Sequence, residues 1–231
     1  MMFLTFNGEC SAEYGVYISG ESTYNTPDCI VETVQVAGRN GELIVDDANF
    51  SNISVKYPCF IRKDLKDTLE NFVSMLASTR GYQRLEDTYH PEIYRLGHYE
   101  KGLSVKTTPL NRGGKFDLEF NCMPQKFLKE GEKKITLEAN GVIKNPTRFS
   151  SKPMLRVYGT GTLTIQGQTI TITTADGYTD IDCELMEAYK GSTNCNGNVT
   201  LPDNVYLFGG NNTFTLSGVT KVEITPRWWT L

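Results

Sequence analysis

Three carboxylates occupy alternate positions in the stretch TDIDCELMEAY, at Asp180, Asp182 and Glu184. Side chains two residues apart in an extended strand point to the same face, so these three form a row. Paired carboxylates can serve a glycosidase, and clusters of them can bind Ca²⁺, which would raise the melting temperature. Carboxylates of one strand, however, lie side by side and do not flank a sugar from opposite sides. We therefore interpret the row as a solvated strand face.

The other residues that could carry chemistry are few. His90 and His98 are the only histidines, and neither has a Glu or Cys at metal-ligand spacing. The motifs of nucleophile elbows, zincins and P-loops do not occur. Residues 159–161 read Gly-Thr-Gly, but they lie between two predicted strands and open no helix that could hold a phosphate. The sequence thus predicts no catalytic residue, no metal and no cofactor, and hence a protein that is not an enzyme.

Composition favours a β-rich fold in one large or two modest domains. The chain has 231 residues, 11% aromatic residues and 21 glycines, which is typical of many short strands joined by tight turns. The net charge of −4 argues against a surface that binds nucleic acid. No run of about 18 apolar residues and no signal-peptide pattern is present, so we expect no membrane contact and cytosol-like surroundings. The six scattered cysteines are then expected to be reduced and mostly buried.

The first half of the chain predicts a sheet covered by one helix. Strands are expected over residues 2–6, 13–18, 30–36, 43–45, 53–61, 82–85, 93–99, 103–106 and 115–122. Pro58 places its strand at an edge or an end, because proline donates no ladder hydrogen bond. The helix spans DLKDTLENFVSMLASTRG, with Asp64 as N-cap and Gly81 after its C-terminus. Its apolar stripe consists of Leu65, Leu69, Phe72, Val73 and Leu76.

The amino-acid composition changes at MPQKFLKEGEKK, residues 123–134. This stretch is rich in lysine, which is typical of a solvated linker. A domain boundary is expected between about residues 124 and 150. Beyond it, TLTIQGQTITIT alternates Leu163, Ile165, Ile170 and Ile172 with threonines around Gly167, which predicts a hairpin with one wet face. NTFTLSGVTKVEITP repeats this scheme around a Ser217-Gly218 turn. Seven or so short strands in about 85 residues predict a β-sandwich.

The chain ends on PRWWTL, which contains both tryptophans. Continuing the alternation of Val222 and Ile224 places Pro226 and Trp228 on the core side and Arg227 and Trp229 on the other. A bulge at Pro226 would exchange the two tryptophans. Earlier in the chain, the sequence AGRNGEL predicts a hairpin turn, because Asn40 and Gly41 tolerate the positive φ of a tight turn.

Several stretches together resemble one family. FNGECSAEYGVYI, VQVAGRNGEL, the single helix, KNPTRFSSKPMLRVYGTGTLTIQG, IDCELMEAYKG and ITPRWWTL occur in an order that is similar to the distal tail proteins (Dit) of long-tailed bacteriophages, the phage tail component family. The resemblance covers almost the whole chain. It implies a mainly β fold (β-rich α+β), with an N-terminal tail-tube-like β domain with one α-helix over residues 1–130. A linker and a galectin-like β-sandwich domain then occupy residues 131–231.

The resemblance also implies a function. Family members are structural hubs that form a hexameric ring between the tail-tube protein and the tail-associated fibre/lysin protein, at the tail tip of the virion. DNA passes through the channel of the ring without specific binding. The protein is made in the cytoplasm of the bacterial host and contacts no membrane. The loop over residues 190–206 is short, which puts direct capture of receptor-binding proteins in doubt and leaves receptor-binding or baseplate proteins open as partners.

Two groups of residues are the expected interaction sites. Gly38, Arg39, Asn40 and Gly41 form the candidate ring-forming arm, for which an ordinary solvent-exposed hairpin is the alternative. Trp228, Trp229 and Arg227 form the candidate contact for domain or subunit packing, since aromatic anchors are typical of such contacts.

A lectin-like protein that binds host cell-wall or surface glycans is the alternative function. Its aromatic platforms would be Tyr178, Tyr189 and Trp229. A glycosidase, built on the carboxylate row, is a third possibility. A ring is distinguished from both by its mass.

Overall fold

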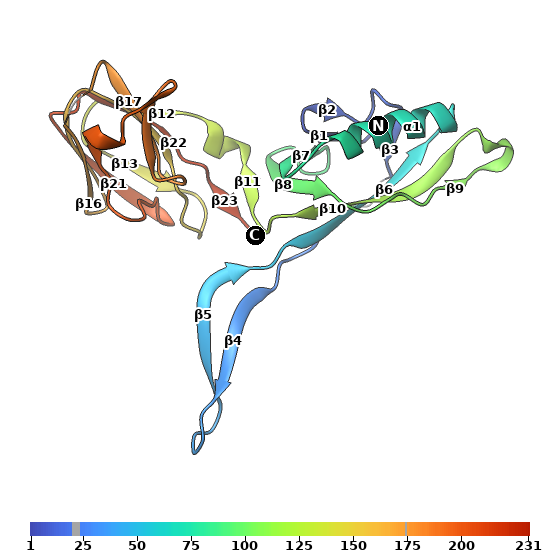
Figure 1. Cartoon of the computed structure of the whole chain (residues 1–231), viewed down its shortest axis with the longest axis horizontal. Coiled ribbons are helices and arrows are strands. Elements are labelled where there is room, and N and C mark those ends of the chain that lie inside the picture. The colour runs from blue at the N-terminus through green and yellow to red at the C-terminus, as the bar shows by residue number, and fades with distance from the viewer. Residues whose placement is uncertain (20–23, 174) are drawn as a thin grey trace. The chain divides into compact units, whose positions relative to one another are not determined.

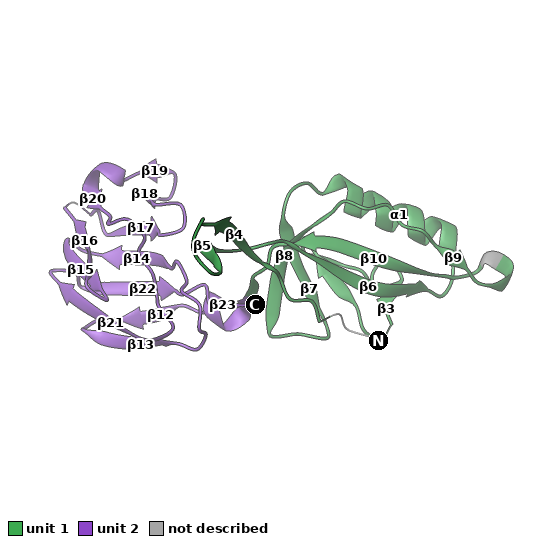
Figure 2. Cartoon of the chain, turned by 90° about the horizontal axis from the view of Figure 1, so that it is seen from below, with its two compact units in different colours: residues 1–126, 231 green, residues 127–230 purple. Residues whose placement is uncertain are grey.

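The computed structural model describes residues 1–19, 24–173 and 175–231. The chain divides into two compact units, which Figure 2 shows in different colours. Unit 1 comprises Met1–Lys126 together with Leu231, and unit 2 comprises Phe127–Thr230. This division lies within the lysine-rich stretch where the composition changes, a few residues before the expected cut at residue 130. Each unit has its own hydrophobic core.

Unit 1 is built on one antiparallel sheet (Figure 1). Its strands follow the order β2-β1-β7-β8-β10-β6-β3, and β9 pairs with β10. Their bounds are β1 Leu4–Phe6, β2 Glu9–Cys10, β3 Val16–Ile18, β6 Ile53–Ile61, β7 Gln83–Asp87, β8 Ile93–Tyr99, β9 Lys106–Thr107 and β10 Gly114–Cys122. Burial alternates along β6 and β10, because ISVKYPCFI and GKFDLEFNC place every second side chain on the core face.

The helix α1, Leu65–Ser78, packs its apolar stripe on this core. Leu65, Phe72 and Leu76 are buried, as the 3.6-residue period predicts. Asp64 stands at the N-cap position but does not cap the helix, which corrects the expectation. Its backbone is left-handed, with a φ of 52°, and its side chain makes no capping hydrogen bond. Gly81 adopts the expected positive φ, +68°, three residues after the helix ends.

Two further expectations for unit 1 are settled by the strand pairing. β3 pairs only with Cys59–Ile61, so no other strand of the described chain pairs with the part of β6 from residue 53 to Pro58 on that side. Pro58 thus lies at an edge, as its missing N–H predicts. The strand expected over residues 103–106 is shorter and later, and β9 is followed by the 3₁₀ helix η1, Pro109–Asn111.

Unit 2 contains two antiparallel sheets, in the orders β12-β22-β14-β17-β18-β19 and β13-β21-β15-β16-β20. Their apolar faces share one core that includes Leu155, Val222 and Ile224 from the first sheet and Leu163 and Phe214 from the second. The strand bounds are β12 Ile135–Leu137, β13 Gly141–Asn145, β14 Met154–Tyr158, β15 Gly161–Ile165, β16 Gln168–Ile172, β17 Tyr178–Asp182, β18 Glu187–Lys190, β19 Thr193–Asn194, β20 Val199–Thr200, β21 Gly210–Ser217 and β22 Lys221–Thr225. Unit 2 is therefore a β-sandwich.

Shorter elements complete unit 2. β11 spans Lys126–Leu128 and pairs with β23, Trp229–Thr230, near the end of the chain. The 3₁₀ helices are η2, Lys129–Glu132, and η3, Asn196–Asn198.

One of the two predicted sandwich hairpins forms and the other does not. β15 pairs with β16 around Gly167, and Leu163, Ile165, Ile170 and Ile172 are all buried. The second prediction is wrong, because β21 and β22 belong to different sheets. The chain crosses from one sheet to the other at Gly218, and a Cβ on Gly161 would lie 2.1 Å from the Ser217 carbonyl oxygen there. Such a close backbone crossing requires glycine.

Candidate interaction surface

The clearest candidate is a two-stranded hairpin of unit 1, which we call the arm. Its strands are β4, Cys29–Gln35, and β5, Glu42–Phe50, and they pair with each other and with no other strand of the described chain. Figure 1 shows the arm as a separate hairpin. The turn between the strands contains the predicted residues Gly38, Arg39, Asn40 and Gly41. Gly38 and Gly41 both have a φ of 81°, which explains why the turn carries glycine at these positions.

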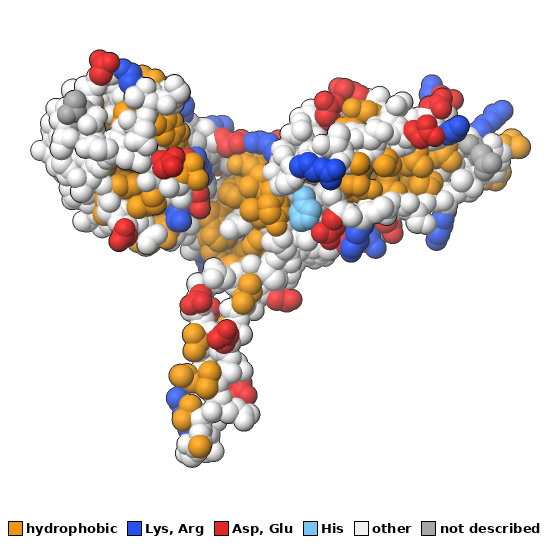
Figure 3. All heavy atoms as spheres, in the orientation of Figure 1, with side chains coloured by type: hydrophobic (Ala, Val, Ile, Leu, Met, Phe, Trp, Pro, Cys, Tyr) orange, Lys and Arg blue, Asp and Glu red, His pale blue; other side chains and the backbone are white. Residues whose placement is uncertain are grey.

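The side chains of the arm are almost all exposed. Its large apolar residues are between 43% and 64% exposed, and they are Ile30, Val31, Val34, Val36, Leu43, Ile44 and Val45. Figure 3 shows hydrophobic side chains along the arm with acidic side chains among them. An isolated two-stranded hairpin is marginally stable in water, and a cluster of exposed apolar side chains commonly marks an interaction site.

The strand register sorts these side chains into two unlike faces. Directly opposed residues share a face, and the pairs Glu32↔Val45 and Val34↔Leu43 alternate with Val31↔Asp46 and Thr33↔Ile44. One face, which we call the apolar face, carries Ile30, Val34, Leu43 and Val45 together with Glu32. The other, the mixed face, carries Val31 and Ile44 among Thr33, Gln35, Glu42 and Asp46. The apolar face is the part of the arm that gains most from being covered.

A bulge interrupts the arm near its base. The register shifts between Ile30 and Val31, and Ala48 takes a φ of 57° on the opposite strand. Asp46 Oδ1 accepts a hydrogen bond of 2.7 Å from the Ala48 N–H, which holds this conformation. Bulges bend the strand that contains them. Asp46 therefore has a local structural role in the arm.

The arm is acidic. It contains Glu32, Glu42, Asp46 and Asp47 against Arg39 alone. Among the residues that the structure describes, none of these four carboxylates forms an ion pair. The sequence predicts the turn and the two strands, but it does not show that their faces stay uncovered.

The closing segment, residues 226–230, is the second predicted site. Burial alternates from Val222 through Ile224 and Pro226 to Trp228, so the predicted parity is confirmed. Trp228 is 3% exposed and belongs to the sandwich core. Its backbone carbonyl accepts a hydrogen bond from the Leu128 N–H at 2.9 Å. A Cβ on Gly131 would lie 2.3 Å from the Trp228 nitrogen, so only glycine fits beside this segment.

Arg227 and the carboxylate row meet in a way that the sequence did not predict. Arg227 donates two hydrogen bonds of 2.8 Å to Asp182, and Arg156 donates bonds of 2.7 and 2.9 Å to Asp180. Asp180 and Asp182 are 4% and 5% exposed, so the expected solvated strand face is wrong for these two residues, whereas Glu184 lies beyond β17 and is exposed. Asp180 and Asp182 are buried because two planar guanidinium groups cover them in bidentate geometry.

The electrostatics of Asp182 follow from this pairing. Burial raises the pKa of Asp182, but the hydrogen bonds and charge of Arg227 outweigh burial and hold the pKa below its ordinary value. The Glu184 N–H, at 2.9 Å, donates to the same carboxylate. Among the described residues, no group of three or more His, Cys, Asp and Glu is placed to hold a metal ion. The Asp182 oxygens are thus engaged inside the protein.

Trp229 lies on the other side of the closing segment and is half-buried. Its ring stacks on Phe149 with a centroid distance of 4.5 Å, and its Nε1–H donates to the Ser150 carbonyl at 2.9 Å. The second tryptophan therefore has partners within the sandwich unit.

Comparisons with known proteins agree with this architecture. No protein-family model matches the sequence, and no curated protein sequence matches it. The structure, however, is similar to the Dit protein of phage SPP1, described as a paradigm of the hub adsorption apparatus in phages that infect Gram-positive bacteria. The two chains share 12% identity over 100% of each, with a TM-score of 0.77. The chain has the Dit fold.

Two further solved structures are similar to the chain. Chains from the phage p2 baseplate in its activated conformation, solved with Ca and with Sr, match with TM-scores of 0.51 and 0.50. Their identities are 10% and 9%, and each match covers 97% of both chains. At these identities the likeness concerns the fold, and it extends over both units.

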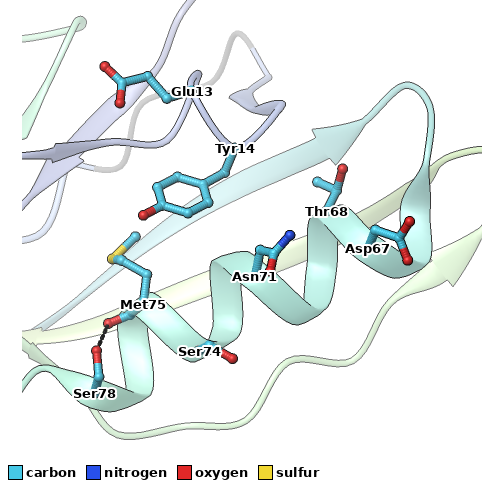
Figure 4. Close-up of a pocket in the computed structure, with 8 residues that line it drawn as sticks. All are labelled: Glu13, Tyr14, Asp67, Thr68, Asn71, Ser74, Met75 and Ser78. Atoms are coloured by element: carbon cyan, nitrogen blue, oxygen red, sulfur yellow. Dashed lines mark hydrogen bonds between the residues drawn. The ribbon is translucent and has the colours of Figure 1, made fainter.

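An open groove of about 680 Å³ lies along the polar side of α1. Figure 4 shows Tyr14 above Met75, Glu13 beyond Tyr14 on the side away from the helix, and Asp67 in the first turn of α1. The lining of the groove contains no histidine, cysteine or lysine. The remaining residues are Thr68, Asn71, Ser74 and Ser78.

The histidines and cysteines take ordinary structural positions. His90 Nδ1 lies 3.4 Å from Asp87, and His98 Nε2 lies 3.0 Å from Glu100. All six cysteines are free, as expected, although only Cys59, Cys122 and Cys183 are buried. Burial raises the pKa of each of these three thiols to about 12, which keeps them protonated and unreactive. No helix in the described ranges is long and apolar enough to span a membrane.

Proposed function

We propose that this protein is a structural hub of a bacteriophage or prophage tail tip, in which copies of the chain close into a hexameric ring through their arms. The observation that carries the proposal is the exposed apolar face of the arm on a chain with the Dit fold. The fold supports a hub, and the arm supplies the surface by which one copy can hold the next.

A ring of identical subunits would provide the cover that the apolar face of the arm lacks in a single copy. Identical subunits that contact each other head to tail form a closed ring if the rotation closes, and each contact joins two different patches. The apolar face would lie on a neighbour, and its residues would leave water. The turn residues Gly38, Arg39, Asn40 and Gly41 would lie at the far end of this contact, where Arg39 can donate two hydrogen bonds.

The ring would join the tail-tube protein on one side to the tail-associated fibre/lysin protein on the other. Residues 1–130 would form the ring, and the sandwich of residues 131–231 would be a galectin-like domain outside it, open to receptor-binding or baseplate proteins. DNA would pass through the channel, and the net charge of −4 is compatible with passage without binding. The protein would act in the virion and be made in the host cytoplasm.

We extend the proposal to the closing segment. Trp228, Trp229 and Arg227 tie the last residues of the chain to the sandwich, and the half-buried Trp229 would contribute its remaining exposed surface to a neighbouring domain or subunit. Aromatic residues are common anchors in such contacts.

The lectin alternative is weaker, because two of its three aromatic platforms, Tyr178 and Trp229, are already occupied. Arg156 lies over the Tyr178 ring at 4.2 Å and Lys190 at 5.4 Å, while Trp229 stacks on Phe149. A sugar ring needs a free aromatic face on which to stack. The glycosidase alternative loses its carboxylates, since Asp180 and Asp182 each bind an arginine.

The test is the mass of the particle. Light scattering at high and low concentration, followed by negative-stain imaging, should show six-fold rings for the wild-type chain. Leu43→Asp, which places a charge on the apolar face, should yield monomers with unchanged melting behaviour. Thr33→Asp, on the mixed face, is the matched control and should leave rings intact. Separate particles at every concentration, even with the adjoining tail proteins supplied, would refute the proposal.

A further inference from the structure

One carboxylate stands within the apolar face of the arm. Glu32 lies between Ile30 and Val34 along β4 and directly opposite Val45 on β5. Among the residues that the structure describes, it has no ion-pair partner. If the apolar face is covered by a neighbour, Glu32 is covered with it. A carboxylate that loses its water in this way is costly unless the receiving surface supplies a cation.

Unit 1 also contains a buried cation without an anion. Arg95 lies in β8 opposite Leu85 of β7, and the residue is only 8% exposed. Its Nη1 is buried and has no hydrogen-bond partner, and no ion pair of Arg95 occurs within the described chain. Buried guanidinium groups are nearly always paired, so this one requires an explanation.

The surroundings of Arg95 are positive. Burial and the neighbouring charge of Arg95 lower the pKa of Lys126, so a second cation lies close by. Asp87 and Arg95 both act electrostatically on Tyr57, but Asp87 is already engaged, because it accepts hydrogen bonds from the Tyr57 hydroxyl at 2.8 Å and from the His90 N–H at 2.8 Å. Gln125 Oε1, next to Lys126 in sequence, is buried without a partner as well. The Arg95 guanidinium is thus a donor without an acceptor, whereas the Gln125 oxygen is an acceptor without a donor.

We propose that Glu32 of one copy binds Arg95 of a neighbouring copy when the arm docks. This inference rests on the proposed function and names the receptor of the arm. The proposed pair brings together two groups that have no partner within one copy: the Glu32 carboxylate on the apolar face of the arm and the buried Arg95 guanidinium. Each charge makes the wrong docking register costly, since a shifted arm would bury both without partners. The pair thus determines the register in which the arm docks and contributes less to the affinity between the two copies.

A double-mutant cycle on assembly tests the pair. Glu32→Gln and Arg95→Gln should each weaken association of the full-length chain at least about 30-fold, measured by sedimentation at several concentrations. The double variant should be no weaker than the worse single variant, because the two changes remove the same interaction. Glu42→Gln, on the mixed face of the same arm, is the matched control and should change association less than about threefold. Additive losses, or no loss from Glu32→Gln, would overturn the pairing.

A stability measurement provides an independent check. Arg95→Met keeps most of the side-chain volume and removes the unpaired charge, so the dissociated chain should melt at a higher temperature than wild type. The same variant should associate more weakly. An unchanged melting temperature together with unchanged association would show that solvent satisfies Arg95, and the inference would fall.

The two proposals fail in distinguishable ways. If wild type and the Gln variants form the same rings while Leu43→Asp does not, the arm forms the ring but Glu32 and Arg95 do not pair. If wild type forms no ring under any condition, the proposed function and the pairing fall together.

Discussion

The arm and the closing segment contain similar residues in opposite circumstances. Both place a charged side chain among apolar ones, Glu32 in the arm and Arg227 in the closing segment. In the closing segment, Trp228 is buried and Arg227 binds Asp182. In the arm, Val34 and Leu43 remain 47% and 43% exposed, and Glu32 has no partner among the described residues. The closing segment finds its partners within the chain, and the arm must find them outside it.

The two regions therefore contribute to different free energies, that of folding and that of association. The contacts of the closing segment contribute to the folding of the sandwich and are present in a single chain. The contacts of the arm would contribute to association and appear only at sufficient concentration. Substitutions in the two regions should therefore change different measured quantities.

The largest expected effect is that of Trp228→Ala. Removing this buried ring leaves a cavity in the sandwich core and should lower the free energy of unfolding by about 3–5 kcal/mol. Chemical denaturation followed by circular dichroism measures the loss. Trp229→Ala is the comparison, and its half-buried ring should cost about 1–2 kcal/mol through Phe149 and Ser150. Equal losses would contradict the assignment of Trp228 as the core residue.

A smaller effect is expected for Asp182→Asn, about 2 kcal/mol at neutral pH, because the buried pair with Arg227 is broken but the arginine keeps partial contact with water. The sign of the pH dependence follows from the lowered pKa of Asp182. A carboxyl whose pKa falls on folding stabilises the protein above its unfolded pKa, and this stabilisation disappears as pH falls through the folded value.

The measurement is the free energy of unfolding from neutral pH to below about pH 4. The difference between wild type and Asp182→Asn should shrink towards the acid end of this range. A difference that stays constant would exclude the ion pair as its source.

Much of the architecture follows from the sequence, because alternation and helical period are local. β6 and β8 have the predicted bounds, and the strand pair β15 and β16 buries the four predicted residues. The parity of Val222 extends correctly to Trp228 because a strand places every second residue on one face. These successes need no knowledge of distant neighbours.

The errors arise where distant segments decide the outcome. The burial of Asp180 and Asp182 depends on Arg156 and Arg227, which lie far from them in sequence. The sheet to which β22 belongs depends on its pairing with β12 and β14. The turn of the arm was predictable from Asn40 and Gly41, but the uncovered faces of its strands were not, since coverage is a property of the whole fold.

The smallest expected effect on folding tests the comparison from the side of the arm. Val34→Ser removes an apolar side chain. In a protein core, the loss of a side chain of similar size lowers the free energy of unfolding by kcal/mol amounts. In the dissociated chain it should change the free energy of unfolding by less than about 0.5 kcal/mol, because exposed substitutions away from special features rarely do more. The same variant should weaken association measurably, since Val34 lies on the apolar face directly opposite Leu43. Ile44→Ser, on the mixed face, controls for lost strand propensity. A large loss of stability from Val34→Ser in the dissociated chain would mean that the arm folds back onto its own chain, and its exposed face would then no longer require a neighbour.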